Sequence, residues 1–282
     1  MFYSKIKKEA LQAHEKAVTK YNDTYSKVQL EGESLYITRK DALDLIRDIE
    51  GLVNSIANSP KEFEAELEKI RAERKRFKKT EEYAQKAHSD VIKSGAGVAV
   101  GITSGAAVAS LAPTAAMWVA TTFGTASTGT AISALHGAVA TKAALAWLGG
   151  GALSAGGGGV AAGQALLALA GPVGWSIAGV ATGASAFFLT HKNHKTADAA
   201  MEQAREITLA GAKLNEMAAV IHNLQEETTQ LYGPLNTEFQ ALRYLNGADY
   251  QSLDEEIQIK LGSMVNKTLT LATLVNKKLG ED

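Results

Sequence analysis

The chain has 282 residues and a formal net charge of −1, so no overall electrostatic field favours nucleic acid or a strongly acidic partner. It contains no cysteine, which excludes a disulfide framework and a thiolate nucleophile. Its first residues, MFYSKIKKEALQAHEK, are charged and amphipathic and lack the continuous apolar stretch of a secretory signal. We therefore expect cytoplasmic synthesis without a signal peptide.

Charge is distributed very unevenly along the chain. From Ser94 to Thr190, a stretch of 97 residues, Lys142 is the only Lys, Arg, Asp or Glu. The same stretch holds all three tryptophans and 19 of the 26 glycines. We expect three parts: an N-terminal helical arm (1–93), an apolar block that enters membranes (94–190) and a C-terminal helical arm (191–282).

The N-terminal arm predicts three amphipathic helices. The first begins near Phe2 and is expected to end at the EGES stretch (31–34), where glycine is a poor helix former. Thr38 with Asp41 resembles a capping box and predicts the second start. The NSPKE stretch (58–62) predicts a third helix that reaches the apolar block. The apolar face of this third helix is expected to be Phe63, Leu67, Ile70, Phe77, Ala84 and Val91.

The third helix contains a basic run, RAERKRFKK (71–79), with six basic residues and one acidic residue. Such a run suits anionic lipid or nucleic acid, but the acidic EFEAELE stretch just before it favours a solvated, charge-balanced helix face. No aromatic side chains interleave with the basic ones in a stacking pattern, so nucleic acid is not an expected partner.

The apolar block is long enough for several membrane spans, each of which needs ~20 apolar residues to cross a ~30 Å bilayer core. Three stretches qualify: 95–112, 130–148 and 160–189. Pro113 is expected to kink the first stretch and extend it to Phe123, and Pro172 to bend the third. Lys142 interrupts the second, at a cost of roughly 2.5–3.5 kcal/mol if it lies centrally. With 28 alanines and only nine leucines, the block predicts marginal insertion, which suits a protein that also stays in water.

Small residues recur at four-residue spacing in the block, and such rows allow close helix packing in lipid. The residues expected to insert or pack helices are Gly97, Gly101, Gly105, Pro113, Trp118, Trp147, Gly151, Gly159, Gly163, Pro172, Trp175, Gly179 and Gly183. His136 and Lys142 either line a lumen or are tolerated polar residues near a helix end. Basic residues at the borders suit headgroup contact: Lys93, His191, Lys192, His194 and Lys195.

The C-terminal arm predicts three further helices. A seam with steps of three, four and seven residues comprises Ile207, Leu214, Met217, Ile221, Leu224 and Leu231. We expect Gly233-Pro234 to stop this helix and Asn246-Gly247 to end a short second one. Ser252 with Glu255 predicts the cap of a last helix that ends at Gly280. Nothing alternates with period two, so the fold class is all-α: an elongated bundle of long amphipathic helices around or beside an Ala/Gly-rich apolar hairpin region.

Catalytic chemistry finds little support. The glycine-rich LAWLGGGALSAGGGGVAAG (145–163) lacks the Lys-Ser/Thr ending of a phosphate-binding loop, and we expect a turn at the tip of an apolar hairpin there. His191 and His194 have metal-ligand spacing but no acidic third ligand nearby, so a basic interfacial cap is favoured. We expect no enzyme, no cofactor, no metal, no small-molecule substrate and no nucleic acid.

The order of parts resembles α-helical pore-forming toxins of the cytolysin and tripartite-haemolysin type, in which a helical bundle stores a hydrophobic head that later inserts. The segment from Gly124 to Gly163 is similar to glycine-rich stretches of uncharacterised bacterial proteins, which suggests a bacterial source. The resemblance implies a membrane-active protein, a toxin or a cell-suicide effector, that inserts its apolar block and oligomerises to permeabilise a bilayer. Its expected partners are the lipid bilayer and further copies of itself or a related helical chain, and its active form is membrane-associated.

Two alternatives remain open. The chain is also consistent with a constitutive integral membrane protein whose helical arms dock partners, and with a soluble helical scaffold whose Ala/Gly block is a buried core.

Overall fold

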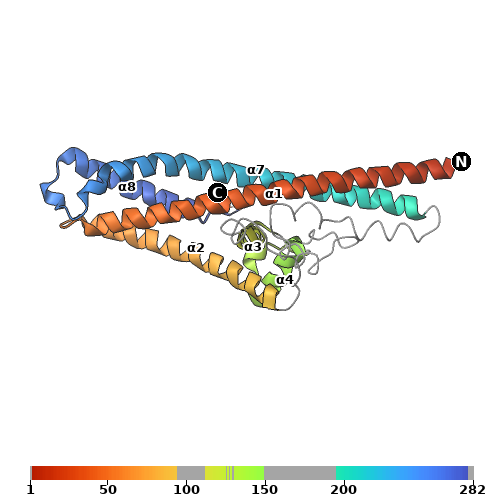
Figure 1. The fold of residues 1–282 in the computed structure, drawn as a ribbon, viewed down its shortest axis with the longest axis horizontal. Helices are drawn as coiled ribbons and strands as arrows, with labels where there is room; N and C mark the ends of the chain where they lie inside the picture. The colour runs from red at the N-terminus through yellow and green to blue at the C-terminus, as the bar shows by residue number, and fades with distance from the viewer. Residues whose placement is uncertain are drawn as a thin grey trace, which may run out of the picture. The chain divides into compact units, whose positions relative to one another are not determined.

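The computed structural model describes residues 2–93, 112–124, 126, 128, 130–148 and 195–278. Every regular element among them is a helix, which confirms the predicted all-α fold. In chain order the elements are α1 (Phe2–Ser55), α2 (Lys61–Lys93), α3 (Ala112–Phe123), η1 (Ile132–Ala134), α4 (Gly137–Leu148), α7 (Lys195–Leu242), η2 (Arg243–Leu245), η3 (Tyr250–Ser252) and α8 (Glu255–Leu274) (Figure 1).

The chain forms two compact units. Unit 1 comprises Met1–Glu33 and Glu82–Ile221, and unit 2 comprises Ser34–Glu81 and His222–Asp282. The helices α1, α2 and α7 each contribute one part to unit 1 and another to unit 2. The units therefore group the chain differently from the three parts that composition suggests.

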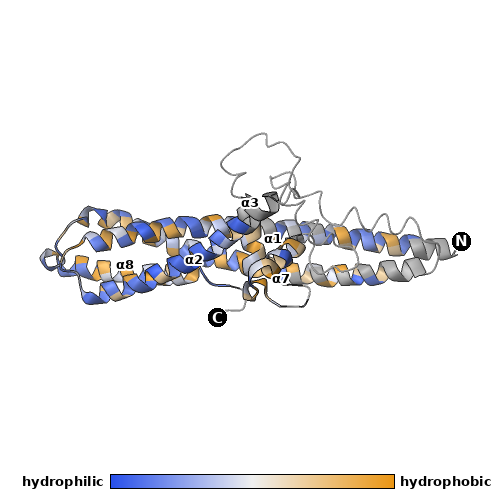
Figure 2. Ribbon diagram, turned by 90° about the horizontal axis from the view of Figure 1, so that it is seen from below, coloured by the Kyte–Doolittle hydropathy of each residue, from blue (hydrophilic) through white to orange (hydrophobic). Residues whose placement is uncertain are grey.

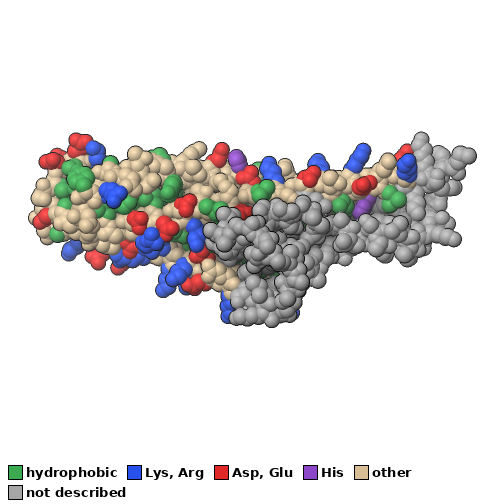
Figure 3. Space-filling view, in the orientation of Figure 1, with side chains coloured by type: hydrophobic (Ala, Val, Ile, Leu, Met, Phe, Trp, Pro, Cys, Tyr) green, Lys and Arg blue, Asp and Glu red, His purple; other side chains and the backbone are tan. Residues whose placement is uncertain are grey.

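Unit 2 is built from two helical hairpins, α1 with α2 and α7 with α8 (Figure 1). Its helices carry apolar residues at helical spacing among hydrophilic ones (Figure 2). The side chains that these stripes bury include Leu35, Ile46, Ile49, Val53, Leu67, Ile70, Phe77, Leu224, Leu235, Leu261, Met264 and Leu271. On the face of the molecule in Figure 3, the acidic and basic side chains of the described residues are interspersed rather than gathered into one patch.

The tips of the two hairpins of unit 2 are joined by backbone hydrogen bonds. The amide of Ala57 donates to the Ala248 carbonyl (2.8 Å), and the amide of Tyr250 donates to the Ala57 carbonyl (2.9 Å). The Asn58 side chain, on a residue with φ of 52°, donates to Asp249 (2.8 Å). These bonds fix which ends of the hairpins lie together.

At its other end, α8 is held by side chains of the first hairpin. Arg39 of α1 is fully buried and donates to the carbonyls of Leu274 (3.2 Å) and Lys277 (2.9 Å). These carbonyls lie at the C-terminal end of α8, where the helix dipole favours a cation, and the Leu274 carbonyl also accepts from the Lys277 amide (3.0 Å). Asn276 donates to the backbone carbonyl (2.9 Å) and the carboxylate (2.8 Å) of Glu73 in α2.

Three predictions about the N-terminal arm have different outcomes. The third helix begins at Lys61, and the Phe63 amide donates to the Pro60 carbonyl (3.0 Å), which confirms the start predicted from NSPKE. The predicted end at the EGES stretch is wrong, because α1 continues from Phe2 to Ser55. The predicted capping box is also wrong: Thr38 lies inside α1 and its hydroxyl donates to the Ser34 carbonyl (3.0 Å).

Two predicted boundaries in the C-terminal arm are wrong as well. The helix α7 passes through Gly233 and Pro234 to Leu242, although proline removes a helix hydrogen bond. Leu235 and Leu242, which both follow the proline, are buried, so packing holds the segment helical. The turn at Asn246-Gly247 is confirmed, with Gly247 at φ 77°.

The last helix also differs from its prediction. Asp254, not Ser252, is the residue at the start of α8, and the Ser252 hydroxyl instead donates to the Asp249 carbonyl (2.7 Å). The helix ends at Leu274, before the predicted end at Gly280, which lies outside the described residues. Arg39 donates hydrogen bonds to backbone carbonyls at this buried helix end and so stabilises it.

Candidate functional site

The candidate site is the part of the apolar block that the structure describes, within unit 1: α3, η1 and α4. Every residue from Met117 to Gly124 is buried. Because this run covers two turns of helix and the residue after it, the second half of α3 is shielded from water on all sides. An apolar helix in such a position is a core element of unit 1.

The two buried threonines of α3 differ in their hydrogen bonding. The Thr121 hydroxyl contacts the carbonyl oxygens of Met117 (2.9 Å) and Trp118 (3.1 Å). A threonine whose hydroxyl bonds a carbonyl of its own helix needs no other hydrogen-bond partner in an apolar environment. The Thr122 hydroxyl is buried with no hydrogen-bond partner found in the described part of the chain.

A tight connection joins α3 to α4. Trp118 packs edge-on against Phe123, with 5.6 Å between ring centroids. After the helix, the Gly124 amide donates to the Ala120 carbonyl (3.0 Å), and the Ile132 amide donates to the Gly124 carbonyl (2.9 Å). A Cβ on Gly124 would lie 2.3 Å from the Ala120 oxygen, so this turn requires glycine.

The helix α4 is buried along one face only. Its buried residues are Ala140, Ala144, Leu145 and Trp147, whereas Lys142 is exposed and Val139 is 63% exposed. The only charged residue of the apolar block therefore lies on the face of α4 that does not pack. His136, just before this helix, is exposed too.

Two contacts join this segment to the charged helices within unit 1. On α1, a Cβ at Gly32 would lie 2.4 Å from Cγ2 of Val119, so α3 approaches the α1 backbone closely at the glycine. On α2, the Tyr83 hydroxyl donates to the Gly137 carbonyl (3.1 Å) and lies 2.9 Å from the Thr141 hydroxyl. Neither Gly32 nor Tyr83 was among the predicted site residues, because their partners lie far away in the sequence.

The predicted site residues fall into two groups. Among the described ones, Trp118 and Trp147 are buried, His136 and Lys142 are exposed, Pro113 lies in the first turn of α3, and Lys93 and Lys195 are terminal residues of α2 and α7. The others lie outside the described residues: Gly97, Gly101, Gly105, Gly151, Gly159, Gly163, Pro172, Trp175, Gly179, Gly183, His191, Lys192 and His194.

The predicted spans are only partly described. The stretch 130–148 is not one helix, because η1 and α4 are separate elements and α4 has 12 residues, a length of about 18 Å. The stretches 95–111 and 160–189 lie outside the described residues. Within the described ranges, no helix combines the length and the apolar character that crossing a bilayer requires.

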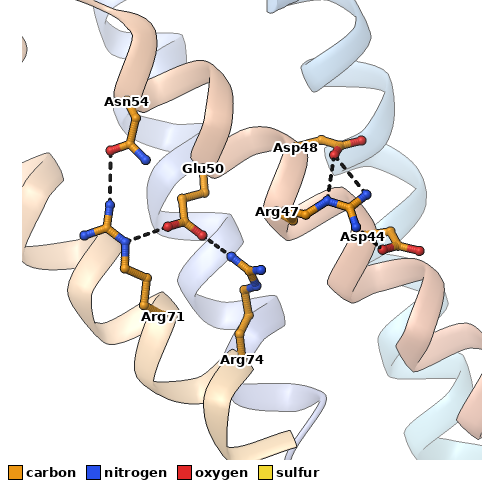
Figure 4. Close-up of polar contacts among 7 residues, drawn as sticks. All are labelled: Asp44, Arg47, Asp48, Glu50, Asn54, Arg71 and Arg74. Carbon is orange, nitrogen blue, oxygen red and sulfur yellow. Dashed lines mark hydrogen bonds and ion pairs between the residues drawn. The ribbon is translucent and has the colours of Figure 1, made fainter. Parts of the chain in front are cut away.

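The basic run 71–79 is a second candidate site, and it lies in unit 2. Figure 4 shows Glu50 of α1 between two arginines of α2: Arg71 donates to it at 2.5 Å, and Arg74 donates to its other oxygen. Arg71 also donates to Asn54 (3.2 Å), and Arg76 lies 3.9 Å from Glu73. Arg71, Arg74 and Arg76 of the run are thus engaged in ion pairs within unit 2.

No grouping of acidic and histidine side chains suited to a metal ion occurs in the residues that the structure covers. No protein-family model, curated protein or solved structure matches this chain.

Proposed function

We propose that the chain is a membrane-active helical protein that inserts its apolar block and oligomerises to permeabilise a bilayer. The observation that supports this most directly is the burial of α3 within unit 1, against a charged, amphipathic α1. A water-exposed protein that stores an apolar segment must shield it in this way until it meets lipid.

The contacts that hold α3 and α4 within unit 1 are of kinds that can break and re-form. The approach at Gly32 is made of van der Waals contact, and the bonds of Tyr83 join it to uncharged groups of α4. The one lysine of the block is already on the outer face of α4, so no buried charge pair has to be broken for the segment to leave.

Tryptophan fluorescence offers a direct test, because all three tryptophans lie in the apolar block and none in either arm. Vesicles that contain brominated acyl chains should quench this fluorescence and should release an entrapped dye over the same range of protein concentration. A protein that folds normally but releases no dye at any pH or lipid composition would contradict the proposal.

A matched pair of variants tests whether dye release depends on the docking of α3 in unit 1. Gly32→Ala places a methyl group against Val119 and should speed dye release, because it weakens the docking of α3. Gly51→Ala changes the same helix where no atom lies within 4 Å of the new Cβ, and should leave release unchanged. If both variants released dye at the same rate, dye release would not depend on the docking of α3.

The same burial also suits the soluble scaffold, in which α3 never leaves unit 1. That alternative predicts a detergent-free soluble protein with tryptophans that brominated lipid does not quench. A constitutive membrane protein predicts instead that the full chain requires detergent from the start.

A further inference from the structure

Several polar side chains of unit 2 lie, along the sequence, close to the points where the chain passes from one unit to the other. Unit 2 begins at Ser34 in α1, ends its first segment at Glu81 in α2, and resumes at His222 in α7. There are two sets of contacts: Tyr36 and Lys40 bind Glu81, and Gln225 binds Ser34. We name these five residues together the polar clamp. It links all three helices whose residues divide between the units.

Glu81 of α2 is the centre of the clamp. One oxygen, Oε1, accepts from the Tyr36 hydroxyl (2.7 Å) and from the Lys40 ammonium (2.9 Å). The Glu81 side chain is 16% exposed and Tyr36 is fully buried, so water competes little for these bonds. Hydrogen bonds to a shielded carboxylate are among the stronger ones in proteins.

The Tyr36 ring is positioned as firmly as its hydroxyl. It stacks on Phe77 of α2, with 6.5 Å between centroids, and Lys40 Nζ lies 5.9 Å from the centre of the tyrosine ring. Burial and the neighbouring Glu81 raise the pKa of Tyr36, so the hydroxyl keeps the proton that it donates. The third helix joins through Gln225 of α7, which donates to the Ser34 hydroxyl (2.6 Å).

These contacts matter because the helices are continuous across the boundary. A helix loses order residue by residue from a disrupted point, since each lost turn removes the support of the next. Opening within unit 1 would therefore extend along α1, α2 and α7 into unit 2 unless tertiary contacts stop it.

We infer that the polar clamp stops this spread, so that unit 2 stays folded while the helices of unit 1 separate to release the apolar block. The purpose of such a device rests on the proposed function. The device itself is a property of the folded chain in water, and it is tested without any membrane.

The experiment is hydrogen exchange of the full-length protein, read by mass spectrometry of peptides from each unit. Gly32→Val opens unit 1 by forcing α1 from α3, and Gly32→Ala replaces it if the valine variant does not fold. Tyr36→Phe removes the clamp hydroxyl but keeps the stacked ring. Tyr250→Phe is the matched control, because it removes a tyrosine hydroxyl of unit 2 but keeps a ring that packs on Phe63 at the hairpin tips (5.7 Å between centroids).

With the clamp intact, opening unit 1 should speed exchange in residues 8–30 and leave residues 41–55 and 63–77 within about twofold of the wild type. Adding Tyr36→Phe to the opened variant should speed exchange in these last two ranges by about tenfold or more, the loss of one hydrogen bond to a charged group. Adding Tyr250→Phe should not.

Two results would overturn the inference: exchange that spreads into unit 2 when only Gly32 is changed, or a Tyr36→Phe addition that behaves like Tyr250→Phe. Neither depends on dye release, so failure of the clamp and failure of the proposed function are separately visible.

Discussion

Gly32 of α1 and Val119 of α3 lie so close that a Cβ on the glycine would sit 2.4 Å from a methyl carbon of the valine. The two residues are distant in sequence, one in a charged arm and the other in the apolar block. A glycine that looks like a helix breaker is thus the point where an apolar helix approaches a charged one.

The first prediction concerns this contact. Gly32→Ala should lower the free energy of unfolding by about 1–3 kcal/mol, the usual cost of overpacking. Gly51→Ala in the same helix should raise it by roughly 0.5–1 kcal/mol, because alanine is the better helix former and meets no neighbour there. Urea unfolding of both variants measures whether the change in unfolding free energy has opposite signs.

Val119→Ala supplies the complementary half of this prediction. Combined with Gly32→Ala, it should destabilise less than the sum of the two single changes, because the smaller side chain makes room for the new methyl group. Strict additivity would mean that the contact does not limit the approach of α3 to α1.

The second prediction concerns Glu50, whose side chain is 12% exposed between Arg71 and Arg74. Glu50→Gln should cost about 1–3 kcal/mol of unfolding free energy, since it removes a shielded negative charge to which two guanidinium groups donate. Glu256→Gln is the matched control, because it breaks the solvent-exposed pair with Lys260 (2.6 Å) and should change stability little. Equal effects would show that burial adds nothing to the Glu50 cluster.

The third prediction concerns Arg39, the buried cation at the C-terminus of α8. Burial lowers the pKa of Arg39 to about 9, so the side chain is still charged at neutral pH. Arg39→Met keeps most of the volume but leaves the Leu274 and Lys277 carbonyls without this donor, at a cost of about 1–3 kcal/mol. Hydrogen exchange should become faster first in the last turn of α8; a uniform change over unit 2 would contradict the capping role.

The fourth prediction is a pH dependence that arises in unit 1. His14 of α1 is buried, and this burial lowers its pKa below the ordinary value of 6.5. The unfolded chain then binds a proton at a higher pH than the folded chain, so stability is full above 6.5 and falls as the pH drops through the lowered pKa.

His14→Gln should remove this acid-dependent loss, whereas Lys16→Gln, at an exposed position of the same helix, should keep it. Thermal unfolding between neutral and mildly acidic pH makes the comparison. A wild-type stability that does not decrease on acidification would contradict it.

Much of the secondary structure could be predicted from local pattern. The face of Phe63, Leu67, Ile70, Phe77 and Ala84 is buried as its spacing predicts, and the helix that carries it starts at the predicted turn. Trp118 and Trp147 were singled out as packing residues of the apolar block, and both are buried. These results depend on periodicity, which a single helix already encodes.

Two of the incorrect boundaries, at Gly32 and at Pro234, share one physical cause. Gly32 and Pro234 were expected to end helices because each carries a local cost, about 1 kcal/mol for glycine and about 3 kcal/mol for proline. In the structure, Leu235 beside the proline is buried, and Gly32 accommodates Val119. Burial of this kind outweighs the local cost, and only the partners that the tertiary structure brings reveal it.

The amino-acid sequence by itself therefore determined the all-α class, the apolar faces and the isolation of nearly all charge from one long block, because these depend on residues that are neighbours along the chain. The tertiary structure decided where the helices end and which residues meet the apolar segment. Two such contacts join distant parts of the chain: Gly32 with Val119, and Tyr83 with Thr141. A pattern of neighbouring residues cannot predict them, because it does not show which distant residues meet.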